Sequence, residues 1–201
     1  MNNNIFTSFK LVLGSGSPRR RELLNALNIP FRINVVETDE NWPSALPCTE
    51  VPVYLALQKA RAQNNQLASD ELLITADTVV ILNKTILNKP IDLNEAAEML
   101  ERLSGNTHTV VTGVCLSRHN KYTCFFDATE VTFNTLTQSE IEYYLKNYSP
   151  LDKAGAYGIQ EWIGCIAMRD IHGNYNNVVG LPTDLLYQKL KTLDNLTWHY
   201  Y

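Results

Sequence analysis

The sequence lacks the patterns that mark several large classes of protein. No apolar run is long enough to span a bilayer, and the N-terminus lacks the charged start and apolar core of a signal peptide. None of its four cysteines forms a Cys-x-x-Cys pair, and no histidine lies near them at metal-binding spacing. We therefore expect a cytoplasmic protein with buried, reduced thiols and no membrane partner. A disulfide between Cys115 and Cys124, across a hairpin, is the less favoured alternative.

A global basic field is also absent. The chain has 17 basic and 21 acidic residues, a net charge of −4, so nothing in its overall charge attracts nucleic acid. A phosphorylated ligand would need a local group of cations. The sequence contains no Walker loop, no dinucleotide-binding fingerprint and no Ser-His-Asp pattern. Its 201 residues fit a single domain, residues 1–201, with one or two lobes.

Helical and extended patterns alternate along the whole chain. Mixed connections of this kind predict an α/β fold with a mixed sheet. Strands are expected at 11–13, 31–37, 72–82, 108–117, 122–133, 162–169 and 175–179. Helices are expected at 18–27, 49–66, 92–103, 137–147 and 183–193.

The residues after the first expected strand favour an anion site. Ser17 is a suitable helix N-cap, and Pro18 suits the first helical position. The open N–H groups of this helix and the basic side chains of Arg19 and Arg20 would then face the preceding loop, as a phosphate requires. Cations at the start of a helix are repelled by the helix dipole, which prefers acidic groups at that end. The alternative to a phosphate site is that both arginines are solvated surface residues.

Asp77 is the most unusual acid in the sequence, because it interrupts an apolar β-forming run. A carboxylate there needs a hydrogen-bonding or charged partner, a bound metal, or exposure to solvent. Asp39 and Glu40 could help it hold a hard divalent cation. Lys59 and Lys89 could add positive charge for a polyphosphate, although each alone is most simply a solvated lysine.

A block of small residues surrounds Tyr157 and ends at Gln160. Such a segment is typical of a loop held close to a ligand, and the Gln160 amide could read a nucleotide base through its donor and acceptor. The alternative is a tight structural turn with Tyr157 packed inward.

Six short motifs, in this order along the chain, together resemble the Maf family of nucleoside triphosphate pyrophosphatases, also called septum-formation-inhibitor proteins. They are Ser15-Gly16-Ser17-Pro18-Arg19-Arg20, Ala76-Asp77-Thr78, Lys89-Pro90, Ser104-Gly105, residues 152–160 and Gly180-Leu181-Pro182. The resemblance implies a two-lobed α/β fold with a long curved mixed sheet flanked by helices, similar to that of inosine triphosphate pyrophosphatases, with the active cleft between the lobes. It also implies a homodimer that hydrolyses a nucleoside triphosphate with Mg²⁺ or Mn²⁺.

The resemblance assigns roles residue by residue. It implies that Asp77 is the proton acceptor and that Glu40 and Asp77 lie at the metal. It implies that the substrate is bound by Ser15, Arg19, Arg20, Lys59, Thr78, Lys89 and Gln160. Among these, it ties Arg19, Thr78 and Gln160 to the choice of substrate. The chain departs from the family pattern at Gly14, where alanine is usual, and at Glu161, where glycine is usual.

Residues 152–160 resemble the subgroup that acts on dTTP and UTP. Two alternatives remain open: the sister activity on 7-methyl-GTP, and a non-catalytic nucleotide-binding regulator of septum formation. The role of Asp77 is also open, because a carboxylate bound directly to a metal has a lowered pKa and is a poor base.

Overall fold

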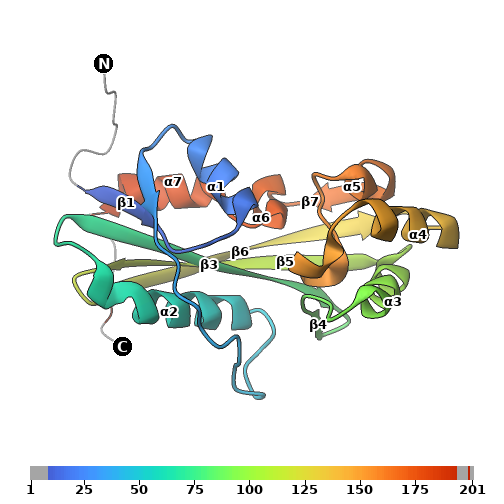
Figure 1. The fold of residues 1–201 in the computed structure, drawn as a ribbon, viewed down its shortest axis with the longest axis horizontal. Helices are drawn as coiled ribbons and strands as arrows, with labels where there is room; N and C mark the ends of the chain where they lie inside the picture. The colour runs from blue at the N-terminus through green and yellow to red at the C-terminus, as the bar shows by residue number, and fades with distance from the viewer. Residues whose placement is uncertain (1–8, 194–198, 200–201) are drawn as a thin grey trace. The chain divides into compact units, whose positions relative to one another are not determined.

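The computed structural model describes residues 9–193 and His199. Its strands form a seven-stranded sheet in the order β2-β1-β3-β5-β6-β7, with β4 paired to β3 (Figure 1). They are β1 Lys10–Leu13, β2 Phe31–Ile33, β3 Glu71–Leu82, β4 Thr85–Leu87, β5 Thr107–Arg118, β6 Lys121–Phe133 and β7 Met168–His172. β1 is parallel to β2 and β3, whereas the β3–β4 and β6–β7 pairs are antiparallel. The predicted mixed sheet is confirmed.

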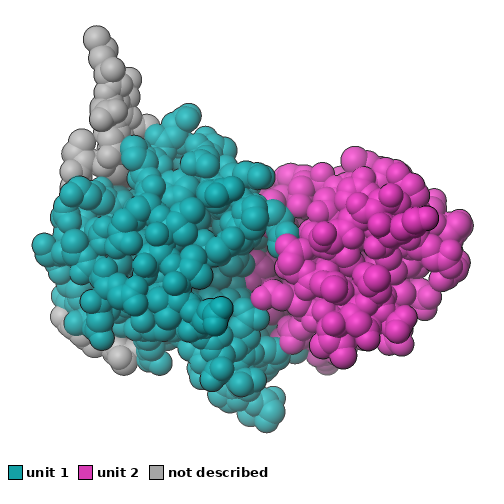
Figure 2. Space-filling model, viewed as in Figure 1, with its two compact units in different colours: residues 1–77, 112–127, 180–201 teal, residues 78–111, 128–179 magenta. Residues whose placement is uncertain are grey.

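Helices lie on both faces of this sheet (Figure 1). They are α1 Pro18–Asn25, α2 Val51–Gln63, α3 Leu93–Leu103, α4 Gln138–Asn147, α5 Trp162–Ala167, α6 Tyr175–Val179 and α7 Thr183–Lys191, with single turns η1 Asn64–Gln66, η2 Pro150–Asp152 and η3 Ala154–Ala156. None of the helices within residues 9–193 is long and apolar enough to cross a membrane. The chain divides into two compact units, which agrees with the predicted two lobes (Figure 2).

Unit 1 consists of the described parts of Met1–Asp77, Thr112–Asp127 and Gly180–Tyr201. Side chains alternate between the faces of a strand, so its short apolar strands supply two cores at once. Leu11 and Leu13 of β1 pack in one cluster with Leu24 of α1 and with α7, whereas Val12 packs in another with Ala56 of α2. Accordingly, α1 and α7 cover one face and α2 covers the other (Figure 1).

Unit 2 consists of Thr78–Val111 and Ala128–Val179. One apolar cluster fills it, with strand residues such as Val80 and Phe133 packed against Leu100 of α3, Ile141 of α4 and Ile163 of α5. Each unit therefore has a core of its own. Asp77 and Thr78 are neighbours in β3 but belong to different units.

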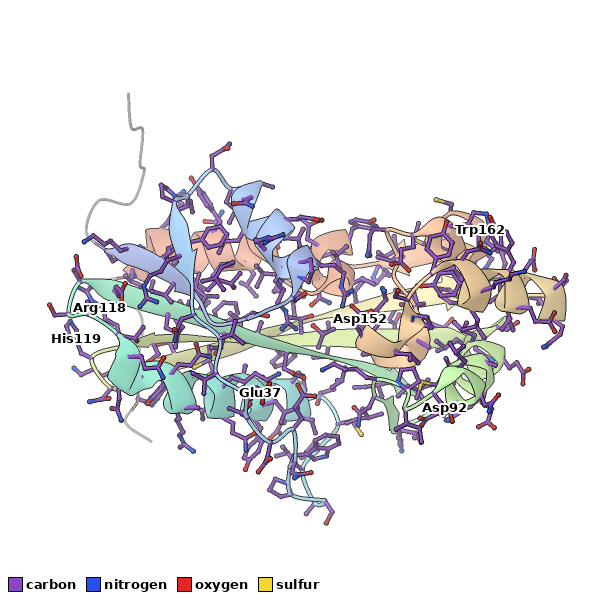
Figure 3. All side chains as sticks on the ribbon, in the orientation of Figure 1. Glu37, Asp92, Arg118, His119, Asp152 and Trp162 are labelled. Carbon is purple, nitrogen blue, oxygen red and sulfur yellow. The ribbon has the colours of Figure 1, made fainter. Side chains whose placement is uncertain are left out.

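Local sequence signals fix several element ends as expected. The Asp92 side chain, labelled in Figure 3, accepts a hydrogen bond from the Glu95 N–H at the start of α3. Thr137 and Glu140 form a capping box at the start of α4, where the sequence predicts a helix. The expected hairpin joins β5 to β6 through residues 119 and 120.

Two predicted strands near the C-terminus are wrong. Residues 162–169 form mainly α5, because a short buried apolar run does not distinguish a helix from a strand by its periodicity. Residues 175–179 form α6, whose first turn is capped by the Asn174 Oδ1 bound to the N–H groups of Asn176 and Asn177. The strand predicted at 31–37 ends at Ile33.

Candidate active site

The loop after β1 and the start of α1 have the predicted local structure. Ser17 is the N-cap of α1, and its Oγ lies 3.5 Å from the Arg20 N–H. Pro18 occupies the first turn. The buried Ser15 Oγ accepts a hydrogen bond from the Ser17 N–H at 3.3 Å. Two serine hydroxyls thus hold the turn that leads into the open N-terminus of α1.

Arg20 connects three segments of unit 1. Its Nε donates to the Gly180 carbonyl at 2.8 Å, and its Nη1 donates to the Ala76 carbonyl at 2.8 Å and to the Ser15 Oγ at 3.3 Å. Burial lowers the pKa of the Arg20 guanidinium, and the nearby charge of Asp77 opposes that shift. Because Ala76 precedes Asp77, Arg20 fixes the backbone beside the candidate catalytic acid. This structural role adds to the substrate binding predicted for it, which stays a prediction.

Lys59 brings the two predicted acids together. Asp77 lies in β3 with 8% of its surface exposed, and its Oδ1 is 2.5 Å from the Lys59 Nζ. Glu40, from the loop after β2, places its Oε1 3.0 Å from the same Nζ. Lys59 projects from α2, which packs against the sheet. The ammonium therefore supplies the partner that a carboxylate needs inside an apolar strand.

The donor set at this cluster fits a hard divalent cation. The Asp77 and Glu40 carboxylates already converge on one positive charge, the Lys59 ammonium. Magnesium commonly takes only one or two protein carboxylates and completes its shell with water and substrate phosphates. Within residues 9–193 and His199, no group of three or more His, Cys, Asp or Glu residues is placed to hold a metal ion.

The other predicted substrate residues lie elsewhere in the two units. Arg19 is partly exposed in the first turn of α1, in unit 1. Thr78 is partly exposed in β3, whereas Lys89 and Gln160 are exposed in loops; all three belong to unit 2. Their parts in binding stay predictions.

A polar network in unit 2 holds the segment that carries Gln160, and the sequence analysis missed it. The Tyr144 hydroxyl donates to the Glu161 carboxylate and accepts a hydrogen bond from the Gly158 N–H at 3.1 Å. The buried Lys153 Nζ lies 3.1 Å from the Glu161 Oε1. A methyl group at Gly158 would lie 2.8 Å from the Glu161 carboxyl carbon and 3.0 Å from the Gln160 Nε2. Glu161, the departure from the family pattern, is therefore an anchor of this turn.

His108 and Tyr157 form a second buried pair in unit 2. The His108 Nε2 lies 2.7 Å from the Tyr157 Oη. Burial lowers the pKa of His108 to about 4 and raises the pKa of Tyr157 above its ordinary value. Tyr157 is thus packed inward, as the alternative interpretation of its segment predicted, and His108 is a neutral structural residue.

The mixed sheet and the cluster around Lys59 together define an α/β protein with a charged site of paired acids and bases. The chain belongs to the Maf family: the family model described as "Maf-like protein" matches residues 10–193. This confirms the resemblance carried by the six motifs.

Two relatives and one solved structure are similar to this chain. A protein of Porphyromonas gingivalis strain W83 is 52% identical over 186 residues, which cover 91% of this chain and 94% of that protein. A protein of Phocaeicola vulgatus is 48% identical over 186 residues, 92% of this chain and 96% of its own. Both are named dTTP/UTP pyrophosphatase. Among solved structures, the Staphylococcus aureus Ham1 protein matches with a TM-score of 0.47 and 15% identity, over 90% of this chain and 99% of that one.

Proposed function

We propose that this protein hydrolyses dTTP and UTP to the nucleoside monophosphate and pyrophosphate. The observation that carries the proposal is the cluster in which Lys59 joins Asp77 and Glu40, in a chain about half identical to proteins named dTTP/UTP pyrophosphatase. A site that only binds a nucleotide has no need of two carboxylates beside a lysine, whereas hydrolysis needs a group that can take a proton from water.

In this mechanism a water oxygen forms a bond to the α-phosphorus, and the bond to the bridging oxygen of the leaving pyrophosphate breaks. Where it is not bound directly to a metal, the Asp77 carboxylate orients the water and accepts its proton. Lys59 holds that carboxylate in place and stabilises the charge that grows on the phosphates. Arg19, Ser15 and the N–H groups at the start of α1 bind the phosphate chain.

Glu40 and Asp77 are the residues that would hold Mg²⁺ or Mn²⁺, which when bound supplies positive charge for the phosphates and lowers the pKa of a bound water. In that arrangement Asp77 orients the water more than it removes the proton, because a coordinated carboxylate is a weak base.

Substrate choice is assigned to Arg19, Thr78 and Gln160, whereas Lys89 adds positive charge for the phosphates. The Gln160 amide can donate to and accept from the edge of a pyrimidine base. Its turn is anchored by Glu161 and Tyr144, which keeps the backbone beside that amide in one conformation.

The proposal also includes one domain over residues 1–201 that acts as a cytoplasmic homodimer, without nucleic acid or membrane as partner. The net charge of −4 supports the exclusion of nucleic acid. Light scattering on the purified chain tests the dimer.

Pyrophosphate release from dTTP, UTP, CTP, GTP and 7-methyl-GTP tests the activity. We expect the wild type to turn over dTTP and UTP with Mg²⁺ or Mn²⁺, and Asp77→Asn to reduce turnover by roughly 1000-fold. Preference for 7-methyl-GTP would overturn the substrate assignment but keep the reaction. Unchanged turnover in a folded Asp77→Asn variant would remove Asp77 from the chemistry.

A further inference from the structure

The hairpin between β5 and β6 places two cysteines opposite each other. His119 and Asn120 form its turn with φ values of 52° and 58°, as a two-residue type I′ turn requires. Arg118 and His119, labelled in Figure 3, mark this end of unit 1. Because Arg118 ends β5 and Lys121 begins β6, counting outward from the turn pairs Cys115 with Cys124.

The same offset holds at the far ends of the two strands. The Phe133 N–H donates to the Asn106 carbonyl at 3.0 Å, and the hydroxyls of Thr107 and Thr132 lie 2.8 Å apart. Both pairs have the register that the turn sets. Cys115 therefore has Cys124 as its direct neighbour across the ladder.

This cysteine pair lies at a position where the strands are close. The N–H and carbonyl of Tyr122 bond to His199 at 2.9 and 2.8 Å, so they point away from β5 and leave Tyr122 in a non-hydrogen-bonded pair with that strand. Two residues further along, Cys124 has the same type of pairing. Such pairs have Cα atoms about 4.5 Å apart, which is within the range of about 4.4–6.8 Å that disulfides accept.

The surroundings give the two thiols different reactivity. Cys115 is completely buried, packed with Ala56 and Ala60 of α2, whereas Cys124 is partly exposed at the edge of the same cluster. The neighbouring Cys115 thiol and the charge of Arg61 lower the pKa of Cys124, while burial raises the pKa of Cys115. The partly exposed Cys124 thiol is therefore the more reactive one, and the buried Cys115 thiol lies next to it.

We propose that Cys115 and Cys124 form a reversible dithiol–disulfide site whose oxidant is a hydroperoxide. The Cys124 thiol attacks the peroxide, the O–O bond breaks, and an alcohol or water leaves as Cys124 becomes a sulfenic acid. The Cys115 thiol then attacks the Cys124 sulfur, the S–O bond breaks, and water leaves as the S–S bond forms. The two sulfurs lose two electrons in total, and the peroxide gains them.

This site lies beneath α2, the helix that carries Lys59. The Thr75 Oγ1 donates to the carbonyl of Ala56 at 2.7 Å and lies 3.5 Å from the carbonyl of Cys115, so the cysteine strand and α2 share a contact. The inference concerns the two cysteines alone and does not depend on the proposed pyrophosphatase activity.

A chain with Cys48→Ser and Cys165→Ser, which keeps only this pair, tests the proposal. After treatment with hydrogen peroxide we expect the intact mass to fall by two hydrogen atoms, both reactive thiols to disappear and the chain to stay monomeric under denaturation. Dithiothreitol should restore both thiols. The matched control, with Cys115→Ser added, should gain an oxygen or form linked chains instead.

Several results would overturn the proposal. These are the survival of both thiols, stepwise addition of oxygen to Cys124 with Cys115 still reduced, or covalent links only between chains. If the serine variants fail to fold, a peptide map of the oxidised wild-type chain gives the same answer. It must then contain a linked peptide with Cys115 and Cys124.

Discussion

At the scale of single residues, the Asp77 carboxylate shows which part of an ion pair the sequence predicts and which part it does not. The apolar neighbours of Asp77 in β3 indicate that its carboxylate needs a partner. They do not identify that partner, because Lys59 lies 18 positions earlier on a different element. The pairing depends on how α2 packs on the sheet, which no local pattern encodes. The sequence therefore predicts that the Asp77 carboxylate needs a partner, but it does not predict the contact with Lys59.

Lys59→Met should damage both stability and turnover. It leaves the buried Asp77 carboxylate without its ammonium, so we expect the free energy of unfolding to fall by about 3 kcal/mol. Turnover of dTTP should fall by about 100-fold, because the charge that stabilises the phosphates is lost. Urea unfolding and pyrophosphate release measure the two effects.

The double variant Lys59→Met/Asp77→Asn separates these effects. Removing both charges should recover most of the lost stability, since residue 77 is then no longer a buried carboxylate without its ammonium, while turnover stays low. A double variant as unstable as Lys59→Met would show that Lys59 contributes through packing of its aliphatic stem and not through the ion pair.

His108 should make the protein sensitive to mild acid. Its pKa is about 4 in the folded protein, below its ordinary value of 6.5, so the unfolded chain binds a proton first as the pH falls. The contribution of neutral His108 to the free energy of unfolding is fully present above pH 6.5. It is lost as the pH falls from 6.5 to about 4, and the total loss is about 3 kcal/mol. Urea unfolding between pH 7 and 4 measures this loss. His108→Gln should lack this part of the pH dependence; an unchanged slope would contradict the assignment.

At the scale of elements, the sequence predicted helix starts better than strand positions. Ser17, Asp92 and Thr137 each carry a local signal, and each caps its helix in the structure. The strands predicted at 162–169 and 175–179 lacked such a signal and are mainly helical.

The caps of α1 and α4 offer a matched test of the phosphate site. Ser17→Ala and Thr137→Ala should each lower the free energy of unfolding by about 1 kcal/mol, because each removes one cap. Only Ser17→Ala should also raise the KM for dTTP, since α1 and not α4 begins at the predicted site. Equal effects on KM would indicate that α1 contributes stability alone.

Gly113 sets the position of α2. A methyl group at Gly113 would lie 2.4 Å from the backbone of Pro52 and Val53, so Gly113→Ala must push the start of α2 away from β5. We expect a loss of about 3 kcal/mol in thermal or urea unfolding, with lower turnover because Lys59 moves. At Gly16, where a methyl group would meet only Val35 at 3.9 Å, alanine should change stability little. Similar losses in both variants would exclude this packing argument.

At the scale of the whole molecule, the six motifs in their order along the chain predicted the family, which no single motif did. The α/β class and the mixed sheet followed from alternating patterns, and the family followed from six motifs in sequence. The network of Tyr144, Lys153 and Glu161 could not be predicted, because its members come from separate elements and meet only in the folded unit. Contacts of this kind depend on tertiary packing and not on local propensity.

The position at which water enters the products tests the central claim most directly. With dTTP and water labelled with heavy oxygen, attack at the α-phosphorus places the label in thymidine monophosphate and leaves pyrophosphate unlabelled. We predict this result for the wild type and almost no labelled product with Asp77→Asn. Label in pyrophosphate, or release of orthophosphate with thymidine diphosphate, would contradict the account.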